Sequence, residues 1–213
     1  MSREAVQRAL LSPLAKPAVF VLWLLPFIWL AWAAVSNQLG ANPAEALIRS
    51  LGDWTIRALV LVLLVTPLRT ALRMPALARF RRMLGLFVFF YATLHWLAYV
   101  WFDMQFDWAE VLADVPKRPF ILVGTLAWLV LLALAATSFN RAIRALGAPR
   151  WQLLHRSVYA VALLSVLHFF WMRAGKNDFN EVAVYAALFA GLLGWRLWKR
   201  LAPPQASGIS RRI

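Results

Sequence analysis

The sequence contains no cysteine. This absence excludes disulfides, thiolate zinc sites, cysteine-ligated iron–sulfur clusters and thiolate-ligated haem, so any redox chemistry must run on another bound cofactor. Charged residues are also scarce, at 15% of the 213 residues, whereas hydrophobic residues make up 62%. Soluble domains average roughly 25% and 45–50% for these two classes. The composition therefore excludes an ordinary soluble domain.

Apolar runs of about 18 or more residues recur along the chain, and each is long enough to cross a bilayer as a helix. The alternating segments of about ten residues that make a transmembrane β-barrel are absent. We predict an all-α polytopic membrane protein, with one transmembrane domain at 1–202 and a disordered tail at 203–213. Its six predicted transmembrane helices are Pro17–Val35, Leu51–Pro67, Met83–Phe102, Pro119–Ser138, Trp151–Met172 and Val182–Trp198.

Acidic residues are few, 9 against 23 Lys and Arg, and the basic residues are unevenly distributed. Sixteen lie in the N-terminal segment, the second and fourth connections and the C-terminal segment, whereas five lie in the other three connections. Basic connections stay in the cytoplasm, so both termini are predicted to be cytoplasmic. The formal charge of +14 thus reflects membrane topology rather than nucleic-acid binding. The first apolar run exceeds the roughly 7–15 residues of a signal-peptide core, which predicts an uncleaved first helix.

Only three histidines are present, His95, His155 and His168, and all lie within apolar runs. A lone histidine there is more often a hydrogen-bonded core residue, but an intramembrane imidazole is also a candidate functional group. His95 lies 13 residues after Arg82, and His168 lies 13 residues after His155. At 1.5 Å per residue, His95 and His168 each lie ~20 Å from the cytoplasmic face. Two imidazoles at one depth on two helices are what a bis-histidine haem b requires.

Three segments carry a resemblance to a known family: RRMLGLFVFFYATLHWLAYVW, WQLLHRSVY and HFFWM. They resemble the ferric-reductase-like transmembrane family, and within it the haem-binding membrane subunit of a bacterial protein-methionine-sulfoxide reductase system. The resemblance implies an inner-membrane protein with haem b on His95 and His168, and with His155 as the family's inner histidine. It implies electrons taken from the quinone pool or a cytosolic flavin donor and passed to a periplasmic molybdopterin-containing reductase. Bound FMN is also implied, although no residue pattern locates it.

The chain departs from the wider family on the cytoplasmic side of His95. NADPH oxidase and ferric reductase relatives carry a second histidine 13 or 14 residues earlier, where this chain has Arg82 and Arg81. A guanidinium is always charged and does not ligate iron as an imidazole does, so a second standard bis-histidine haem is not expected. Arg82 and Arg156 are candidates to hold FMN phosphate or haem propionates, against the simpler interpretation of topology-determining charge. Whether His155 binds iron, contacts a cofactor or packs stays open.

We therefore expect an electron-transfer subunit of an oxidoreductase complex rather than its catalytic subunit. Two alternatives are a quinol-oxidising cytochrome b subunit of another complex, and a transporter that uses its histidines to relay protons or bind metal. The absence of intramembrane Asp or Glu beyond Asp53, and of any internal repeat, counts against transport. Gly85 and Gly124 are small enough to let a macrocycle or a neighbouring helix approach, but the sequence assigns neither a function.

Overall fold

The computed structural model describes residues 2–175 and 177–202, which form helices and no strand. Six helical segments within this part of the chain are long and apolar enough to cross a membrane, which confirms the predicted fold class. Helices suit a bilayer because they satisfy their own backbone hydrogen bonds. The six segments are α2 (Ala15–Val35), α3 (Pro43–Ala71), η1 with α4 (Pro75–Phe80 and Arg81–Phe102), α6 (Pro119–Ala136), α8 with α9 (Ala148–His155 and Val158–Ala174) and α10 (Asn180–Leu201).

Three short helices lie where the sequence predicts only connections: α1 (Arg3–Leu11), α5 (Trp108–Asp114) and α7 (Asn140–Leu146). Side-chain caps explain two of them. The Ser2 hydroxyl accepts a hydrogen bond from the first turn of α1, and the Asp107 carboxylate accepts two from the first turn of α5. The tail predicted at 203–213 lies outside the described residues.

The fifth predicted helix is one membrane-spanning segment, but it is interrupted between α8 and α9. The Ser157 hydroxyl donates to the Leu154 carbonyl over 2.7 Å, in competition with the helical backbone bonds. His155 therefore ends α8, while His168 lies on α9, and the two histidines belong to separate helices.

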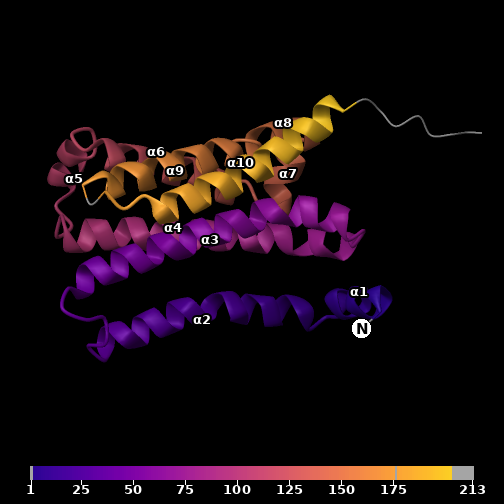
Figure 1. Cartoon of the computed structure of the whole chain (residues 1–213), viewed down its shortest axis with the longest axis horizontal. Helices are drawn as coiled ribbons and strands as arrows, with labels where there is room; N and C mark the ends of the chain where they lie inside the picture. Colours follow the sequence, from indigo (N-terminus) through magenta and orange to yellow (C-terminus); the bar gives the residue numbers. More distant parts are fainter. Residues whose placement is uncertain (1, 176, 203–213) are drawn as a thin grey trace, which may run out of the picture.

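The helices pack as two pairs, with α3 mainly against α4 and α6 mainly against α9. A smaller contact between α4 and α6 joins the pairs, and α10 packs on α9 and α3. Both ends of the described chain lie at one end of the bundle, hereafter the terminal end, and α5 lies at the opposite α5 end (Figure 1). This arrangement agrees with an even number of spans.

Helix α2 lies at one edge of the bundle (Figure 1) and contacts both α3 and α4. A buried hydrogen bond ties it to α4, because the Tyr91 hydroxyl donates to the Trp23 carbonyl over 2.6 Å. Trp54 of α3 stacks on the Tyr91 ring and meets the Trp23 ring edge-on. These three aromatic residues fix the position of α2.

Candidate cofactor site

The rings of His95 and His168 face one another across the interior of the bundle. Their centroids are 6.0 Å apart, and their planes are inclined by 88°. His95 lies seven residues before the end of α4, and His168 lies six residues before the end of α9. At 1.5 Å per residue, both rings are about 10 Å from the α5 end of their helices. The two histidines therefore share one depth, as their spacing predicts.

Each of these histidines is held by a backbone carbonyl of the neighbouring helix. Nδ1 of His95 lies 2.8 Å from the Ile48 carbonyl oxygen, and Nδ1 of His168 lies 2.7 Å from that of Phe120. A carbonyl oxygen only accepts, so Nδ1 donates in both cases and Nε2 carries the free lone pair. Neither Nε2 has a hydrogen-bond partner within 2–175 and 177–202. Both rings therefore present a metal-binding nitrogen.

The two rings line a cavity of about 530 Å³ that reaches the α5 end. Its walls come from α3, α4, α6 and α9, and include the small residues Gly52 and Gly124. Three arginines also line it and are among the five basic residues of the less basic connections: Arg49, Arg118 and Arg173. Arg118 precedes Phe120 by two residues and Arg173 follows His168 by five, so their closeness to these segments was a signal available in the sequence.

One of these arginines has an unsatisfied donor. The Nη atoms of Arg173 pair with Asp178 and Glu181, but its Nε is buried and has no hydrogen-bond partner in the described part of the chain. A buried unpaired donor costs free energy, so this atom calls for an acceptor inside the cavity.

Arg118 is fixed by a small ionic network at the mouth of the cavity. It donates from Nε to Asp114 over 2.8 Å, and the Tyr99 hydroxyl donates to the same carboxylate over 2.8 Å. Burial raises the pKa of the Asp114 carboxyl, but the hydrogen bonds from Arg118 and Tyr99 outweigh burial and hold that pKa below its ordinary value. Burial lowers the pKa of Arg118, and the Asp114 pairing outweighs it, so that pKa is raised. Both groups are charged at neutral pH.

These residues fit a haem on three observations. Metal–imidazole bonds are about 2 Å long, so an iron between two Nε2 atoms separates the ring centroids by about 6 Å. The observed separation is 6.0 Å. The cavity is bordered by Gly52 and Gly124, whose missing side chains make room for the edges of the two rings themselves. The orphan Nε of Arg173 and the neighbouring guanidiniums suit the carboxylates of haem propionates.

The other predicted site residues lie outside this cavity, toward the terminal end. The His155 ring stacks on Trp151 with centroids 4.0 Å apart, and its Nε2 lies 3.2 Å from the Thr137 hydroxyl. Arg82 donates to the Asn140 side chain over 2.9 Å and acts electrostatically on His155. Arg156 is exposed in the turn between α8 and α9. The structure thus brings Arg82 near His155 and separates this group from His95 and His168.

Comparison with known proteins identifies the family. The model of the ferric reductase like transmembrane component matches residues 51–166, which is more than half of the chain. The chain belongs to this ferric reductase like family.

Three relatives in the ferric reductase like family are each named protein-methionine-sulfoxide reductase heme-binding subunit MsrQ. The protein of Polaromonas naphthalenivorans is 65% identical over 92% of this chain and 90% of its own length. Those of Bordetella parapertussis and Caulobacter vibrioides are 51% and 44% identical, over 87% and 82% of this chain and 91% and 82% of their own lengths. No solved structure matches the chain.

The ferric reductase like match covers most of the cavity. It includes His95, Gly52 and Gly124, and it ends two residues before His168.

Proposed function

We propose that this protein is a haem b electron-transfer subunit of the bacterial inner membrane, and that it reduces a periplasmic molybdopterin-containing methionine-sulfoxide reductase. The observation that carries the proposal is the pair of level imidazoles, each with Nδ1 bonded to a carbonyl and Nε2 free. The names of the MsrQ relatives support both the haem and the reductase system. A bound haem b supplies one-electron redox chemistry, while the protein sets ligation, burial and orientation.

His95 and His168 are the residues that would hold the haem iron, and the arginines of the cavity mouth would pair with its propionates. With the basic terminal end in the cytoplasm, the cavity opens toward the periplasm. This orientation places the redox centre within reach of a periplasmic partner docked at the α5 end.

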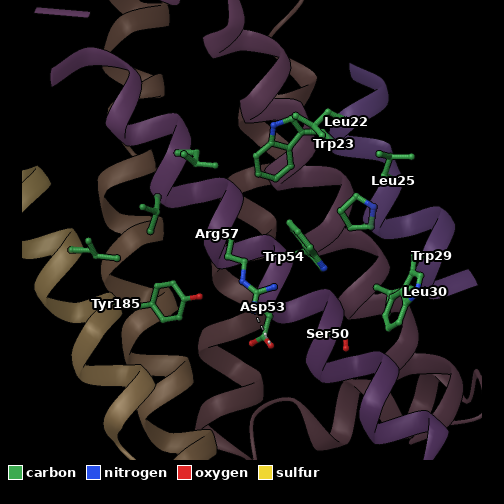
Figure 2. Close-up of a pocket in the computed structure, with 14 residues that line it drawn as sticks. Leu22, Trp23, Leu25, Trp29, Leu30, Ser50, Asp53, Trp54, Arg57 and Tyr185 are labelled. Atoms are coloured by element: carbon green, nitrogen blue, oxygen red, sulfur yellow. Dashed lines mark ion pairs between the residues drawn. The ribbon is translucent and has the colours of Figure 1, made fainter. Parts of the chain in front are cut away.

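Quinol is the proposed electron donor, and a second cavity supports this choice. A groove of about 990 Å³ lies between α2, α3 and α10 (Figure 2). Within it Arg57 lies 3.8 Å from Asp53 and 5.0 Å from the centre of the Trp54 ring. The Arg57 and Asp53 side chains are 45% and 33% exposed, so both are accessible from the groove. An ion pair at membrane depth is a candidate binding or relay site.

The chemistry of this groove suits a quinol head group. A carboxylate accepts from a ring hydroxyl, a guanidinium donates to a ring oxygen, and the aromatic walls contributed by Trp54 and Tyr185 accommodate a flat ring. Asp53 also lines the cavity that holds the two histidines. Asp53 of α3 is thus shared by the two sites, so a quinol bound in the groove would lie next to the cavity that holds the histidines.

The alternative donor is a cytosolic flavin protein, which would approach the terminal end. The cluster of His155, Arg82 and Arg156 is the proposed FMN contact for that route, since guanidiniums bind phosphate well. Its solvent-exposed arginines favour a surface contact there.

Spectroscopy of the purified protein tests the haem assignment. We expect a Soret band that sharpens and shifts when dithionite is added. His95→Ala and His168→Ala should each abolish the signal of this haem, whereas His155→Ala, outside the cavity, should retain it. A colourless protein from cells supplied with haem would refute the function, and a full spectrum in both His95→Ala and His168→Ala would refute the ligand assignment.

A further inference from the structure

The two histidines are held in the same way by two different helices. His95 bonds to the carbonyl of Ile48, four residues before Gly52, and both of these residues lie on α3. His168 bonds to the carbonyl of Phe120, four residues before Gly124, and both of these lie on α6. Each ring thus rests on one helical turn that begins with its carbonyl acceptor and ends with a glycine.

Helix geometry explains the four-residue spacing. In an α-helix the Cα–Cβ bond tilts toward the N-terminus, so a side chain covers the turn that precedes its own Cα. The carbonyl of residue i also lies beside residue i+4, whose N–H it accepts. A Cβ at position 52 would therefore stand over the Ile48 carbonyl, and one at position 124 over that of Phe120. Glycine leaves these oxygens accessible to a second donor.

The distances show how little room is left for a methyl group. A Cβ on Gly52 would lie 3.2 Å from Cε1 and 3.3 Å from Nδ1 of His95. A Cβ on Gly124 would lie 2.8 Å from Nδ1 and 3.0 Å from Cε1 of His168. In both cases the nearest atoms belong to the imidazole edge that makes the hydrogen bond. An added methyl group must push that edge away from its carbonyl.

We propose that Gly52 and Gly124 are positioning residues for the two haem ligands: each opens a carbonyl that fixes the tautomer and the plane of one imidazole. The inference rests on the proposed haem function. A metal-bound histidine whose second nitrogen donates to a carbonyl is oriented and made more basic by that bond. In this proposal the two carbonyls together set the 88° angle between the ring planes and leave both Nε2 atoms free for one metal.

Other helical glycines of the chain provide matched controls. A Cβ on Gly191 or Gly194, both in α10, would meet nothing within 4 Å, and one on Gly85 would come no closer than 3.9 Å to Val62. In a helix interior, alanine is intrinsically more favourable than glycine. Alanine should therefore stabilise each helix slightly. A loss of haem affinity at positions 52 and 124 would then have to come from the contact with the histidine.

The test compares Gly52→Ala and Gly124→Ala with Gly191→Ala and Gly194→Ala in the full-length haem-loaded protein. Three properties are measured: haem affinity, the low-spin ferric electron paramagnetic resonance signal, and carbon monoxide binding to the reduced protein. The resonance signal depends on the angle between the imidazole planes. We expect haem affinity to fall roughly 10–100-fold at positions 52 and 124, the range for losing a group that orients a metal-bound histidine. The resonance should shift and carbon monoxide should bind, with the larger effect at Gly124, where the contact is shorter.

The results for the glycine variants and for the wild type test the inference and the proposed function separately. Helical content and gel filtration identify folded protein, and the milder Gly52→Ala serves if Gly124→Ala does not fold. Haem affinity, resonance and carbon monoxide binding in Gly52→Ala that match wild type and the α10 controls would overturn the inference while leaving haem binding intact. Equal losses in all four variants would overturn it as well, because the effect would not be specific to the histidine contacts. A wild-type protein without haem would instead refute the proposed function.

Discussion

Arg173 lies five residues after His168 on α9, and both line the same cavity, where the Arg173 Nε has no partner in the described chain. Its position about one turn nearer the α5 end than His168 places a positive charge between the proposed haem site and the end of the bundle that we propose faces the periplasm. This charge should favour the reduced haem, because reduction adds one electron to the site.

Replacing Arg173 with glutamine should therefore lower the haem midpoint potential. At an effective dielectric constant of about 20, a unit charge about 10 Å away contributes on the order of 1.7 kcal/mol. That energy is roughly 70 mV for a one-electron couple. A spectroelectrochemical titration measures the shift, with Lys117→Gln in the exposed loop as the control. An unchanged potential would remove Arg173 from the proposed propionate site.

Filling the groove should slow reduction by quinol without affecting the haem. Leu188 lines the groove from α10, so Leu188→Trp should block it, whereas Leu197→Trp on the same helix changes an exposed position outside it. Stopped-flow reduction by a soluble quinol analogue is the measurement, and the dithionite-reduced spectrum should be the same in both. Equal quinol rates in Leu188→Trp and wild type would exclude the groove as the donor site.

The Asp114–Arg118 pair should make stability depend on pH in the acidic range. The pKa of Asp114 is lowered in the folded protein, so the pair stabilises above the ordinary aspartate pKa of about 4. This contribution is lost as the pH falls through the lower folded value. Because 36% of the Arg118 side chain and 19% of the Asp114 side chain are accessible, the pair should contribute no more than about 1 kcal/mol.

Thermal unfolding in detergent between neutral pH and about pH 3 tests this expectation. The difference in Tm between wild type and Asp114→Asn should be largest at neutral pH and should close as the pH falls. Glu110→Gln, on the same short helix, is the control. A difference that stays constant with pH would contradict the assigned ion pair.

Removing the Tyr91 hydroxyl should loosen α2. Tyr91→Phe loses the bond to the Trp23 carbonyl, which should cost about 1 kcal/mol. Unfolding by denaturing detergent measures the loss, and Tyr185→Phe is the control on α10. The same stability in Tyr91→Phe and wild type would mean that this bond does not hold α2 in place.

Apolar run length predicted the six spans, because every span must cross the same bilayer thickness and satisfy its own backbone hydrogen bonds. The shared depth of His95 and His168 followed from a constant rise per residue. The sequence did not predict the break after His155, where the Ser157 hydroxyl bonds to the Leu154 carbonyl. It also did not predict the carbonyl partners, since Ile48 and Phe120 act through the main chain, which residue type does not reveal.

The contact between Gly124 and His168 could not be predicted from the sequence. The small size of this glycine was visible there, but its contact with His168 depends on how α6 and α9 are rotated against each other. The location of Arg49, Arg118 and Arg173 at the cavity was not predicted for a similar reason, because a charge that sets topology and a charge that lines a cavity have the same residue type.

The pairing of α3 with α4 and of α6 with α9 has a consequence for assembly. His95 belongs to the first pair and His168 to the second, and the contact between the pairs is smaller than the contact within them. A haem held by both histidines would cross-link the two hairpin-like halves and stabilise them in proportion to the logarithm of its concentration over its Kd. Haem supply would then govern how much of the protein matures, so that cells short of haem would lose the folded subunit as well as its redox centre.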